Sequence, residues 1–312
     1  MPHIQSIIHP AGVEAARISH LWWVLLGICT VVWIAVAAAT LVAIGRGRRS
    51  ASIATDRQAS RSVAIAALVS VIALIGILTA SAVTGRALDS IRTPGALHLV
   101  VTGNQWWWDV QYTNPNPSLN VQTANEIHIP VGRPVSVSLL STDVIHSFWI
   151  PSLQGKIDTI PGRVNEVWLQ ADTPGLYRGQ CAEYCGAQHA KMALVVVAEA
   201  PDAFERWLTA NRAPATPPST PEQERGKEVV ERGPCAMCHN ITGTLAGGRS
   251  APDLTHIASR STIAAGWLPN TTGNLAGWIA DPQRIKPGCR MPATGLNSAE
   301  LQAVLAYLET LK

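Results

Sequence analysis

The stretch Cys181-Ala-Glu-Tyr-Cys185-Gly-Ala-Gln-His189-Ala-Lys-Met192 brings two thiols, an imidazole and a thioether into one short run. Soft and borderline ligands of this kind favour copper over magnesium, calcium or manganese. Two cysteines four residues apart on a loop can place both sulfurs as bridges between two metal ions. His146, in Asp143-Val-Ile-His-Ser-Phe-Trp149, could reach the same place from a strand. Each ion would then have one histidine, with Met192 and a backbone carbonyl as weak outer ligands.

Two other interpretations fit part of this pattern. Cys181 and Cys185 could form a small disulfide, because disulfides persist in exported domains. A Cys2His2 zinc site would use the same first ligands. Neither alternative explains Met192, which is a poor zinc ligand, or the Trp and Tyr residues near the run. The pattern therefore favours copper.

The region from about residue 93 to residue 200 has the sequence pattern of strands. Branched or alternating residues between Pro, Gly and Asn occur at residues 97–102, 126–129, 135–139 and 166–169. This spacing predicts an all-β sandwich or barrel. His98 and His128 fall on alternating strand positions without a partner cysteine, so we expect structural roles for both.

A second chemical signature is Cys235-Ala-Met-Cys238-His239. Cys-x-x-Cys-His is the attachment motif for c-type haem, in which both thiols add to the haem vinyl groups. His239 would then be the proximal iron ligand. A thioredoxin-like redox pair is the alternative, but the adjacent histidine and the lack of a βαβ pattern argue against it.

The sixth iron ligand follows by elimination among the four methionines of the chain. Met1 is the initiator, Met192 belongs to the copper run and Met237 lies inside the haem motif, which leaves Met291. A methionine ligand raises the haem potential relative to bis-histidine ligation. His256 is the rival ligand, although a hydrogen bond within the haem pocket is the expected role. Cys289 has no assigned role.

The sequence after residue 200 predicts a tether and a helical domain. Residues 201–221 are rich in proline and read as a stiff, extended linker. Residues 222–231 are polar and helix-prone. Residues 298–311 begin with a Ser cap and carry Leu301, Val304, Leu305 and Leu308 on one face. An initial helix, a haem motif, a distal methionine and a final amphipathic helix predict an all-α domain over residues 222–312.

The N-terminal residues 1–92 carry two apolar stretches, at about residues 21–44 and 63–83, each without a charge. Both exceed the roughly 20 residues that cross the hydrocarbon layer. Buried core helices and a cleaved signal peptide are the alternatives. Five arginines against one acid lie at residues 45–62, so the positive-inside rule puts this loop in the cytoplasm and both termini outside. The net charge of only +3 suggests no nucleic-acid partner.

The stretch from Ala124 to Val197 resembles subunit II of the haem-copper cytochrome c oxidases. The resemblance is carried by residues 125–130, 141–149 and 156–163 and by the Cys-x3-Cys-x3-His-x2-Met spacing. It implies a cupredoxin-like Greek-key barrel whose dinuclear copper centre, CuA, is held by six residues: His146, Cys181, Glu183 through its carbonyl, Cys185, His189 and Met192. It also implies a magnesium ion on the Glu183 carboxylate, with Asp158 and Arg163 at the border with subunit I.

The C-terminal part resembles a class I cytochrome c domain, so the whole chain resembles the fused subunit II of a caa-type oxidase. In Gln105-Trp106-Trp107-Trp108, the resemblance makes Trp106 the point of electron entry above the copper pair. At least one of these three Trp residues is expected to fill the core.

The resemblance implies a subunit of cytochrome c oxidase (EC 7.1.1.9) in a bacterial inner membrane. It would relay electrons from cytochrome c or another donor, through haem c and CuA, to subunit I, where oxygen is reduced and protons are pumped. Subunit I, other oxidase subunits and membrane lipid are the expected partners. The chain holds no histidine cluster for oxygen reduction by itself. A membrane-tethered copper-delivery or redox-sensing protein and a nitrous oxide reductase-like copper domain are the alternatives.

Overall fold

The structure is a computed structural model that describes residues 5–47, 56–89 and 92–312. It divides into two compact units, one formed by Met1–Ala15 with Arg92–Lys312 and the other by Ala16–Ile91. The larger unit contains a β-sandwich and a helical domain, which are joined by many hydrogen bonds.

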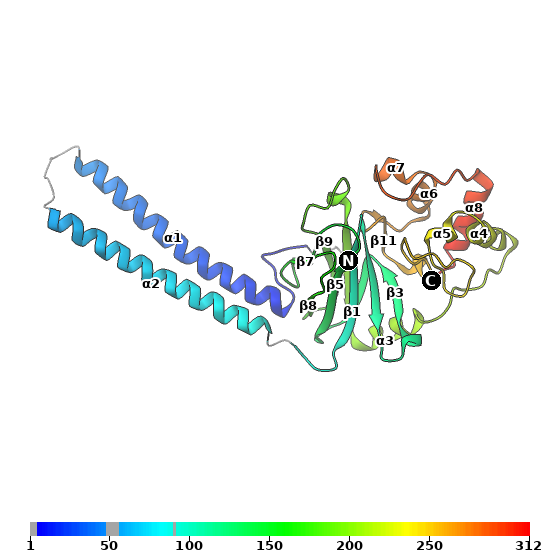
Figure 1. Cartoon of the computed structure of the whole chain (residues 1–312), viewed down its shortest axis with the longest axis horizontal. Helices are drawn as coiled ribbons and strands as arrows, with labels where there is room; N and C mark the ends of the chain where they lie inside the picture. The colour runs from blue at the N-terminus through cyan, green and yellow to red at the C-terminus, as the bar shows by residue number, and fades with distance from the viewer. Residues whose placement is uncertain (1–4, 48–55, 90–91) are drawn as a thin grey trace. The chain divides into compact units, whose positions relative to one another are not determined.

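The smaller unit consists of two long helices that run in opposite directions, α1 (Val13–Gly47) and α2 (Asp56–Asp89) (Figure 1). Both are long and apolar enough to cross a membrane, with candidate spans of 34 and 32 residues. No residue in the most apolar window of either helix is buried within the structure. The structure therefore does not support the buried-core alternative for these helices. Arg48 and Arg49 of the predicted cytoplasmic loop lie outside the described residues.

The β-sandwich is made of two five-stranded sheets, with strand orders β3-β2-β1-β5-β8 and β4-β10-β9-β6-β7. β1 pairs with β5, and β4 with β10, in parallel, while the other pairs are antiparallel. The strands are β1 (Leu97–Asn104), β2 (Trp107–Thr113), β3 (Val121–Ala124), β4 (Glu126–Pro130), β5 (Val135–Ser141), β6 (His146–Trp149), β7 (Ile157–Thr159), β8 (Asn165–Leu169), β9 (Gly175–Cys181) and β10 (Ala193–Glu199). The four strands predicted from alternation are confirmed as β1, β4, β5 and β8.

The hydrophobic core between the two sheets positions His146, one of the predicted copper ligands. Trp108 is completely buried, which confirms that one residue of the Trp run fills the core. Its ring meets Phe148 and His146 edge-on, with centroids 5.5 Å and 5.9 Å away. Gly103 on β1 leaves room for the imidazole, because a Cβ there would lie 2.8 Å from His146 Cδ2. His146 is therefore packed as a core residue at the end of the sandwich.

The C-terminal domain is helical, as predicted. Its helices are α4 (Pro221–Arg232), α5 (Cys235–Cys238), α6 (Thr272–Ala280), α7 (Pro282–Ile285) and α8 (Ser298–Leu308), with a short 3-10 turn at Ile257–Ser259 (η3). Two further 3-10 turns, Pro117–Leu119 (η1) and His189–Lys191 (η2), belong to the β-sandwich domain. A small hairpin, β11 (Thr262–Ile263) with β12 (Leu268–Pro269), adds to the expected all-α pattern. α4 packs on α8 at Gly226, where a Cβ would lie 1.9 Å from the Ala303 carbonyl oxygen.

Two local expectations differ from the structure. The first half of the predicted linker 201–221 forms helix α3 (Pro201–Ala210), whose Phe204 and Leu208 are buried in the core of the β-sandwich. Apolar residues spaced four apart give this segment a helix face that can be buried. The predicted Ser298 cap is wrong, because Asn297 caps α8 and forms a reciprocal capping box with Glu300.

Candidate metal centre

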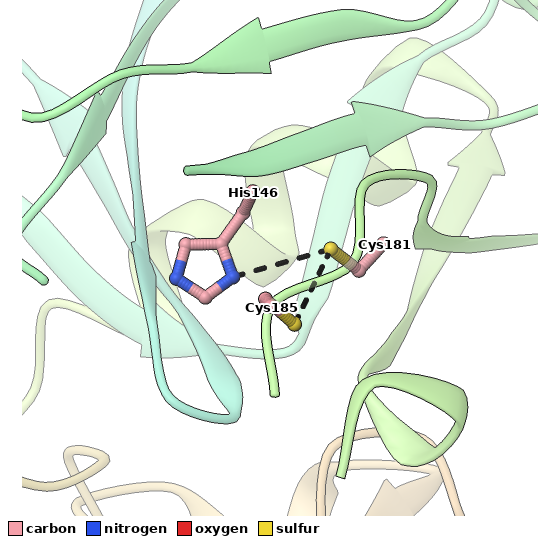
Figure 2. A group of neighbouring side chains, drawn as sticks. All are labelled: His146, Cys181 and Cys185. Atoms are coloured by element: carbon pink, nitrogen blue, oxygen red, sulfur yellow. Dashed lines mark hydrogen bonds between the residues drawn. The ribbon is translucent and has the colours of Figure 1, made fainter. Parts of the chain in front are cut away.

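Three predicted copper ligands meet at the ends of two adjacent strands (Figure 2). His146 begins β6 and Cys181 ends β9, and these strands pair with Phe148 opposite Cys181. Cys185 lies on the loop that follows. The Nδ1 atom of His146 is 4.0 Å from Cys181 Sγ, which is 3.8 Å from Cys185 Sγ. All three side chains are buried, and no disulfide joins the two thiols.

The remaining members of the predicted ligand set surround the two sulfurs. His189 Nδ1 is 3.6 Å from Cys185 Sγ, and the thioether of Met192 is 3.9 Å from the same sulfur. The carbonyl oxygen of Glu183 lies 3.2 Å from Cys181 Sγ. The short turn η2 carries His189 and ends at Met192, so the run folds back over the sulfurs. Two thiols, two imidazoles, a thioether and a carbonyl form a donor set that fits copper.

The two thiols share a hydrogen bond that shifts their pKa values in opposite directions. The hydrogen bond with Cys185 lowers the pKa of Cys181 to about 4. The same contact and burial raise the pKa of Cys185. A thiolate is the form of cysteine that binds metal. One sulfur is therefore ready for a metal ion, and the second would lose its proton on metal binding.

Asp143 orients His146 from the side opposite the sulfurs. Its Oδ1 lies 2.9 Å from His146 Nε2, which leaves Nδ1 facing Cys181. Burial lowers the pKa of His146, but the contacts with Cys181 and Asp143 outweigh it and raise the pKa overall. Asp143 also accepts a hydrogen bond from the amide of Gln105 at 2.8 Å. A carboxylate behind a ligating histidine commonly fixes its tautomer and ring orientation.

Trp106 directly contacts the copper loop, which is the run of residues 181–192. Its indole Nε1 donates to the carbonyl oxygen of Cys185 at 3.0 Å, and the side-chain Nε2 of Gln105 donates to the same oxygen at 2.8 Å. The Trp106 ring is half-buried against the core, in contrast to the buried Trp108. Its role in electron entry stays a prediction.

The haem motif forms the one-turn helix α5, with His239 directly after it. His239 Nδ1 donates to the carbonyl oxygen of Pro252 at 2.7 Å, so the lone pair is on Nε2, the nitrogen that would bind iron. Burial lowers the pKa of His239, which favours this neutral form. Cys235 and Cys238 are free thiols. These features fit covalent attachment of a haem with one histidine ligand.

The predicted distal ligand and its rival differ in their surroundings. Met291 lies half-buried in the loop after α7, where its carbonyl accepts a hydrogen bond from Gln283 at 2.7 Å. Its pairing with His239 stays a prediction. His256 instead faces two carbonyl oxygens, those of Lys312 at 2.7 Å and Ala213 at 3.1 Å. Both ring nitrogens are thus engaged, which argues against iron ligation.

Comparison with known proteins gives the family. The family described as "Cytochrome C oxidase subunit II, periplasmic domain" matches residues 116–199, and "Cytochrome c" matches residues 223–312. The chain is 37% identical over 248 residues to the cytochrome c oxidase subunit 2 of Alkalihalophilus pseudofirmus, covering 77% of this chain and 70% of that protein. This chain belongs to the cytochrome c oxidase subunit II family.

Other subunit II proteins are similar over a larger or smaller part of this chain. The cytochrome c oxidase subunit 2 of Bacillus sp. is 32% identical over 235 residues, covering 72% of this chain and 65% of that protein. A solved periplasmic domain of subunit II of cytochrome oxidase from Bradyrhizobium japonicum is 32% identical, with a TM-score of 0.36, and the match covers 39% of this chain and 97% of that one. The cytochrome c domain fits a subunit II of the caa3 type, and these domains suggest copper and haem as cofactors.

The predicted magnesium ion on the Glu183 carboxylate of this subunit II stays a prediction. The Glu183 carboxylate is half-exposed and lies 4.0 Å from Lys156 Nζ. The same ammonium is 3.1 Å from Asp158. A lysine thus occupies the neighbourhood where a divalent cation was expected.

The two histidines expected to be structural bind neighbouring polar side chains. His98 contacts Ser136 at 3.2 Å and Ser138 at 3.4 Å. His128 lies between two carboxylates, with Glu199 2.8 Å from Nδ1 and Glu126 3.2 Å from Nε2. Neither histidine takes part in the cluster around the thiols.

Sequence reasoning missed two residues near the copper site of this subunit II. The sequence predicts no role for Asp143, although its three-residue spacing from a ligand histidine was the available signal. Lys286 was also missed. Its buried ammonium bonds to backbone oxygens, which carry no signature in the sequence.

Proposed function

We propose that this subunit II relays electrons one at a time from a covalent c-type haem to a dinuclear copper centre and on to subunit I, where oxygen becomes water and protons are pumped. The proposal rests above all on six donor groups meeting at one end of the β-sandwich, with the sulfurs 3.8 Å apart. It assigns residues 93–200 to the copper domain and 222–312 to the haem domain.

In the copper site, Cys181 and Cys185 would bridge two copper ions. His146 and His189 would bind one ion each through Nδ1, and Met192 and the Glu183 carbonyl would be weak outer ligands. The copper pair and the haem supply one-electron chemistry when they are bound, while the protein supplies position and exclusion of side reactions. Asp143 holds the His146 ring, and burial of both thiols keeps solvent from the sulfurs.

In the haem domain, Cys235 and Cys238 would form the covalent attachment, with His239 and Met291 as axial ligands. Trp106 would lie on the path into the copper site, and its indole bonds to the Cys185 carbonyl. The haem domain is already in contact with the copper domain through this region, because Lys286 Nζ donates to the Trp106 carbonyl at 3.0 Å. Attachment in one chain makes the transfer intramolecular, which gives the donor a high effective concentration.

The two apolar helices would anchor both domains on the outer side of a bacterial inner membrane, with both termini on that side. Subunit I, other oxidase subunits and membrane lipid would be the partners, and cytochrome c or another protein would reduce the haem. Magnesium at Glu183 is not included, since Lys156 lies beside that carboxylate.

The test is metal analysis of the isolated full chain, because subunit I would add iron and copper of its own, together with low-temperature electron paramagnetic resonance on the chain purified with its membrane partners. We expect two copper atoms for each haem iron and the seven-line pattern of a mixed-valence copper pair. Cys181→Ser should abolish that pattern. Cys29→Ser is the matched control, because Cys29 lies in α1, away from both metal-binding motifs, and it should leave the pattern intact.

A copper-delivery or redox-sensing protein would give a different result. Delivery requires exchangeable, exposed ligands, whereas His146, Cys181, Cys185 and Met192 are all buried. A four-line pattern from a single copper ion, or fewer than two copper atoms for each iron, would contradict the relay and favour delivery.

A further inference from the structure

Lys286 is a buried lysine at the contact between the haem domain and the copper domain. It follows α7, and only 3% of its surface is exposed. Its ammonium donates to three backbone carbonyl oxygens, those of Lys191 at 2.9 Å, Trp106 at 3.0 Å and Ala264 at 3.3 Å. A lysine ammonium has three donors, so all of them are used. Among the ion pairs formed by described residues, none involves Lys286.

Two of these three acceptors belong to segments that frame the copper ligands. Trp106 bonds through its indole to the carbonyl of Cys185. Lys191 lies in the turn η2 directly before Met192. One ammonium therefore holds both sides of the copper loop against the haem domain.

Side chains of the copper loop also donate hydrogen bonds to backbone carbonyl oxygens of the haem domain. Lys191 Nζ donates to the carbonyl oxygen of Ile285 at 2.5 Å, and Gln188 Nε2 donates to that of Pro287 at 2.7 Å. The backbone on both sides of Lys286 is thus fixed. This segment continues through Arg290, whose guanidinium lies 3.2 Å from Asp143, to Met291.

The burial of Lys286 is unfavourable for the charged side chain. Lysine is almost never fully buried unless it is paired, and burial lowers the pKa of Lys286 to about 8. An apolar residue of similar length would avoid this desolvation. A lysine kept here supplies what an apolar residue lacks, namely three directional bonds to defined backbone positions.

We propose that Lys286 is a positioning residue for electron transfer, which fixes the loop carrying Met291 against the two segments that hold the copper ligands. The inference rests on the proposed function. The transfer moves one electron from the haem domain to the copper domain, and no bond forms or breaks. Its rate falls steeply with distance, so a fixed docked position keeps it fast.

The experiment uses the full chain with both metal groups bound and compares Lys286→Met with the wild type. Laser-flash reduction of the haem gives the rate of transfer to copper. We expect the rate to fall severalfold, because loss of the docked position lengthens the path between the two metal groups. The copper resonance spectrum and the haem potential should not change, because Lys286 touches neither set of predicted ligands.

A second readout does not depend on electron transfer. The amide of Ala193 donates to the Ala265 carbonyl of the haem domain at 2.9 Å, so its hydrogen exchange reports docking. We expect faster exchange of this amide in Lys286→Met. Lys227→Met is the matched control, because Lys227 pairs with Glu231 within α4, and it should change neither the exchange nor the rate.

Arg178→Met tests whether the loss of any hydrogen bond between the two domains slows electron transfer as much as the loss of the Lys286 bonds does. Arg178 donates to the Gly266 carbonyl at 3.0 Å, a hydrogen bond that involves neither Trp106 nor Lys191. It should slow transfer less than Lys286→Met does. Equal slowing by both variants, or a wild-type rate in Lys286→Met, would overturn the positioning role.

The variant can fail to bind the metal groups, and the wild-type chain can show no electron transfer. If Lys286→Met fails to bind both metal groups, Lys286→Gln takes its place, since its shorter side chain has only two donors for the three carbonyl oxygens, and an unchanged rate there overturns the proposal. If the wild-type chain itself shows no transfer from haem to copper, the proposed function fails. In that case the exchange of the Ala193 amide still decides whether Lys286 fixes the docked position.

Discussion

At the scale of single residues, His128 shows how burial and charge combine outside the metal centre. Its ring lies between Glu126 and Glu199 and stacks on Trp207 with centroids 4.1 Å apart. Glu126 in turn accepts hydrogen bonds from the backbone and hydroxyl of Ser261 in the haem domain. When it is protonated, His128 completes a charged cluster that contacts the haem domain through Ser261.

The pKa shifts of this cluster predict how its stability depends on pH. Burial lowers the pKa of His128, but its two carboxylate partners outweigh burial and raise it. Burial raises the pKa of Glu126, but hydrogen bonds from His128 and Ser261 lower it overall. The stabilisation by His128 is fully present at pH values below the pKa that His128 has in the unfolded chain. It is lost as the pH rises through the higher pKa that His128 has in the folded protein. The stabilisation by Glu126 is lost as pH falls through its lowered pKa.

The measurement is the free energy of unfolding in urea at about pH 6 and about pH 9. The wild type should lose roughly 1.4 kcal/mol for each unit by which the pKa of His128 is raised. His128→Gln should lose this alkaline dependence. His98→Gln is the matched control, because His98 contacts two serines rather than carboxylates, and it should keep the wild-type dependence. Equal pH dependence in all three proteins would contradict this account of the cluster.

The candidate site was predictable where chemistry is encoded in local spacing. Cys181, Cys185, His189 and Met192 lie in one run, and Cys235, Cys238 and His239 in another. Lys286 was not predicted, because two of its three partners lie in the other domain, and the only signal for Asp143 was its three-residue spacing from His146. The Lys286 bonds end on backbone oxygens, which every residue type provides.

At the scale of elements, the start of α8 depends on a residue that lies just outside the helix. The Asn297 side chain accepts a hydrogen bond from the Glu300 amide at 3.0 Å, and the Glu300 carboxylate accepts one from the Asn297 amide at 3.0 Å. The reciprocal pair satisfies two backbone groups that the first turn leaves free. α8 also supplies Val304, Leu305 and Leu308 to the core of the haem domain.

Asn297→Ala should therefore destabilise the haem domain by about 1 kcal/mol, the usual cost of losing an N-cap. Ser298→Ala is the matched control and should change the free energy of unfolding by less than about 0.5 kcal/mol. Hydrogen exchange of the α8 amides in the full chain measures both effects. A larger loss in Ser298→Ala would mean that Ser298 is the cap after all.

The sequence predicted helices and strands well where the pattern is local, and less well where tertiary contacts determine the secondary structure. β1, β4, β5 and β8 and the helices α4 and α8 were predicted from alternation, polarity and helical spacing. The prolines of residues 201–221 predict a linker, but Phe204 and Leu208 of helix α3 are buried on the sandwich. The hairpin of β11 and β12 is only two residues long on each side, too short for alternation to be visible.

At the scale of the whole molecule, the two metal-binding domains should be electronically separate although they are in contact. We expect Met291→Ala to lower the haem potential by on the order of tenths of a volt, because the identity of the axial ligand sets the potential. Delivery of electrons to copper should slow, and the copper resonance spectrum should stay intact. Redox titration of the haem absorbance measures the potential.

Met237→Ala is the matched control for this variant. Met237 lies inside the haem motif, but its side chain is 73% exposed, so the potential should not change. Loss of the copper signal in Met291→Ala would count against independent metal sites. An unchanged potential would leave His239 without its predicted partner.

The contact around Lys286 also has an evolutionary consequence. Lys286, Lys191 and Gln188 all donate to main-chain oxygens, including that of Pro287. An acceptor position can change its side chain without losing its carbonyl group, whereas a donor position cannot. Selection should thus retain the donors and let several acceptor positions drift, so paired substitutions across this contact should be rare among homologous chains.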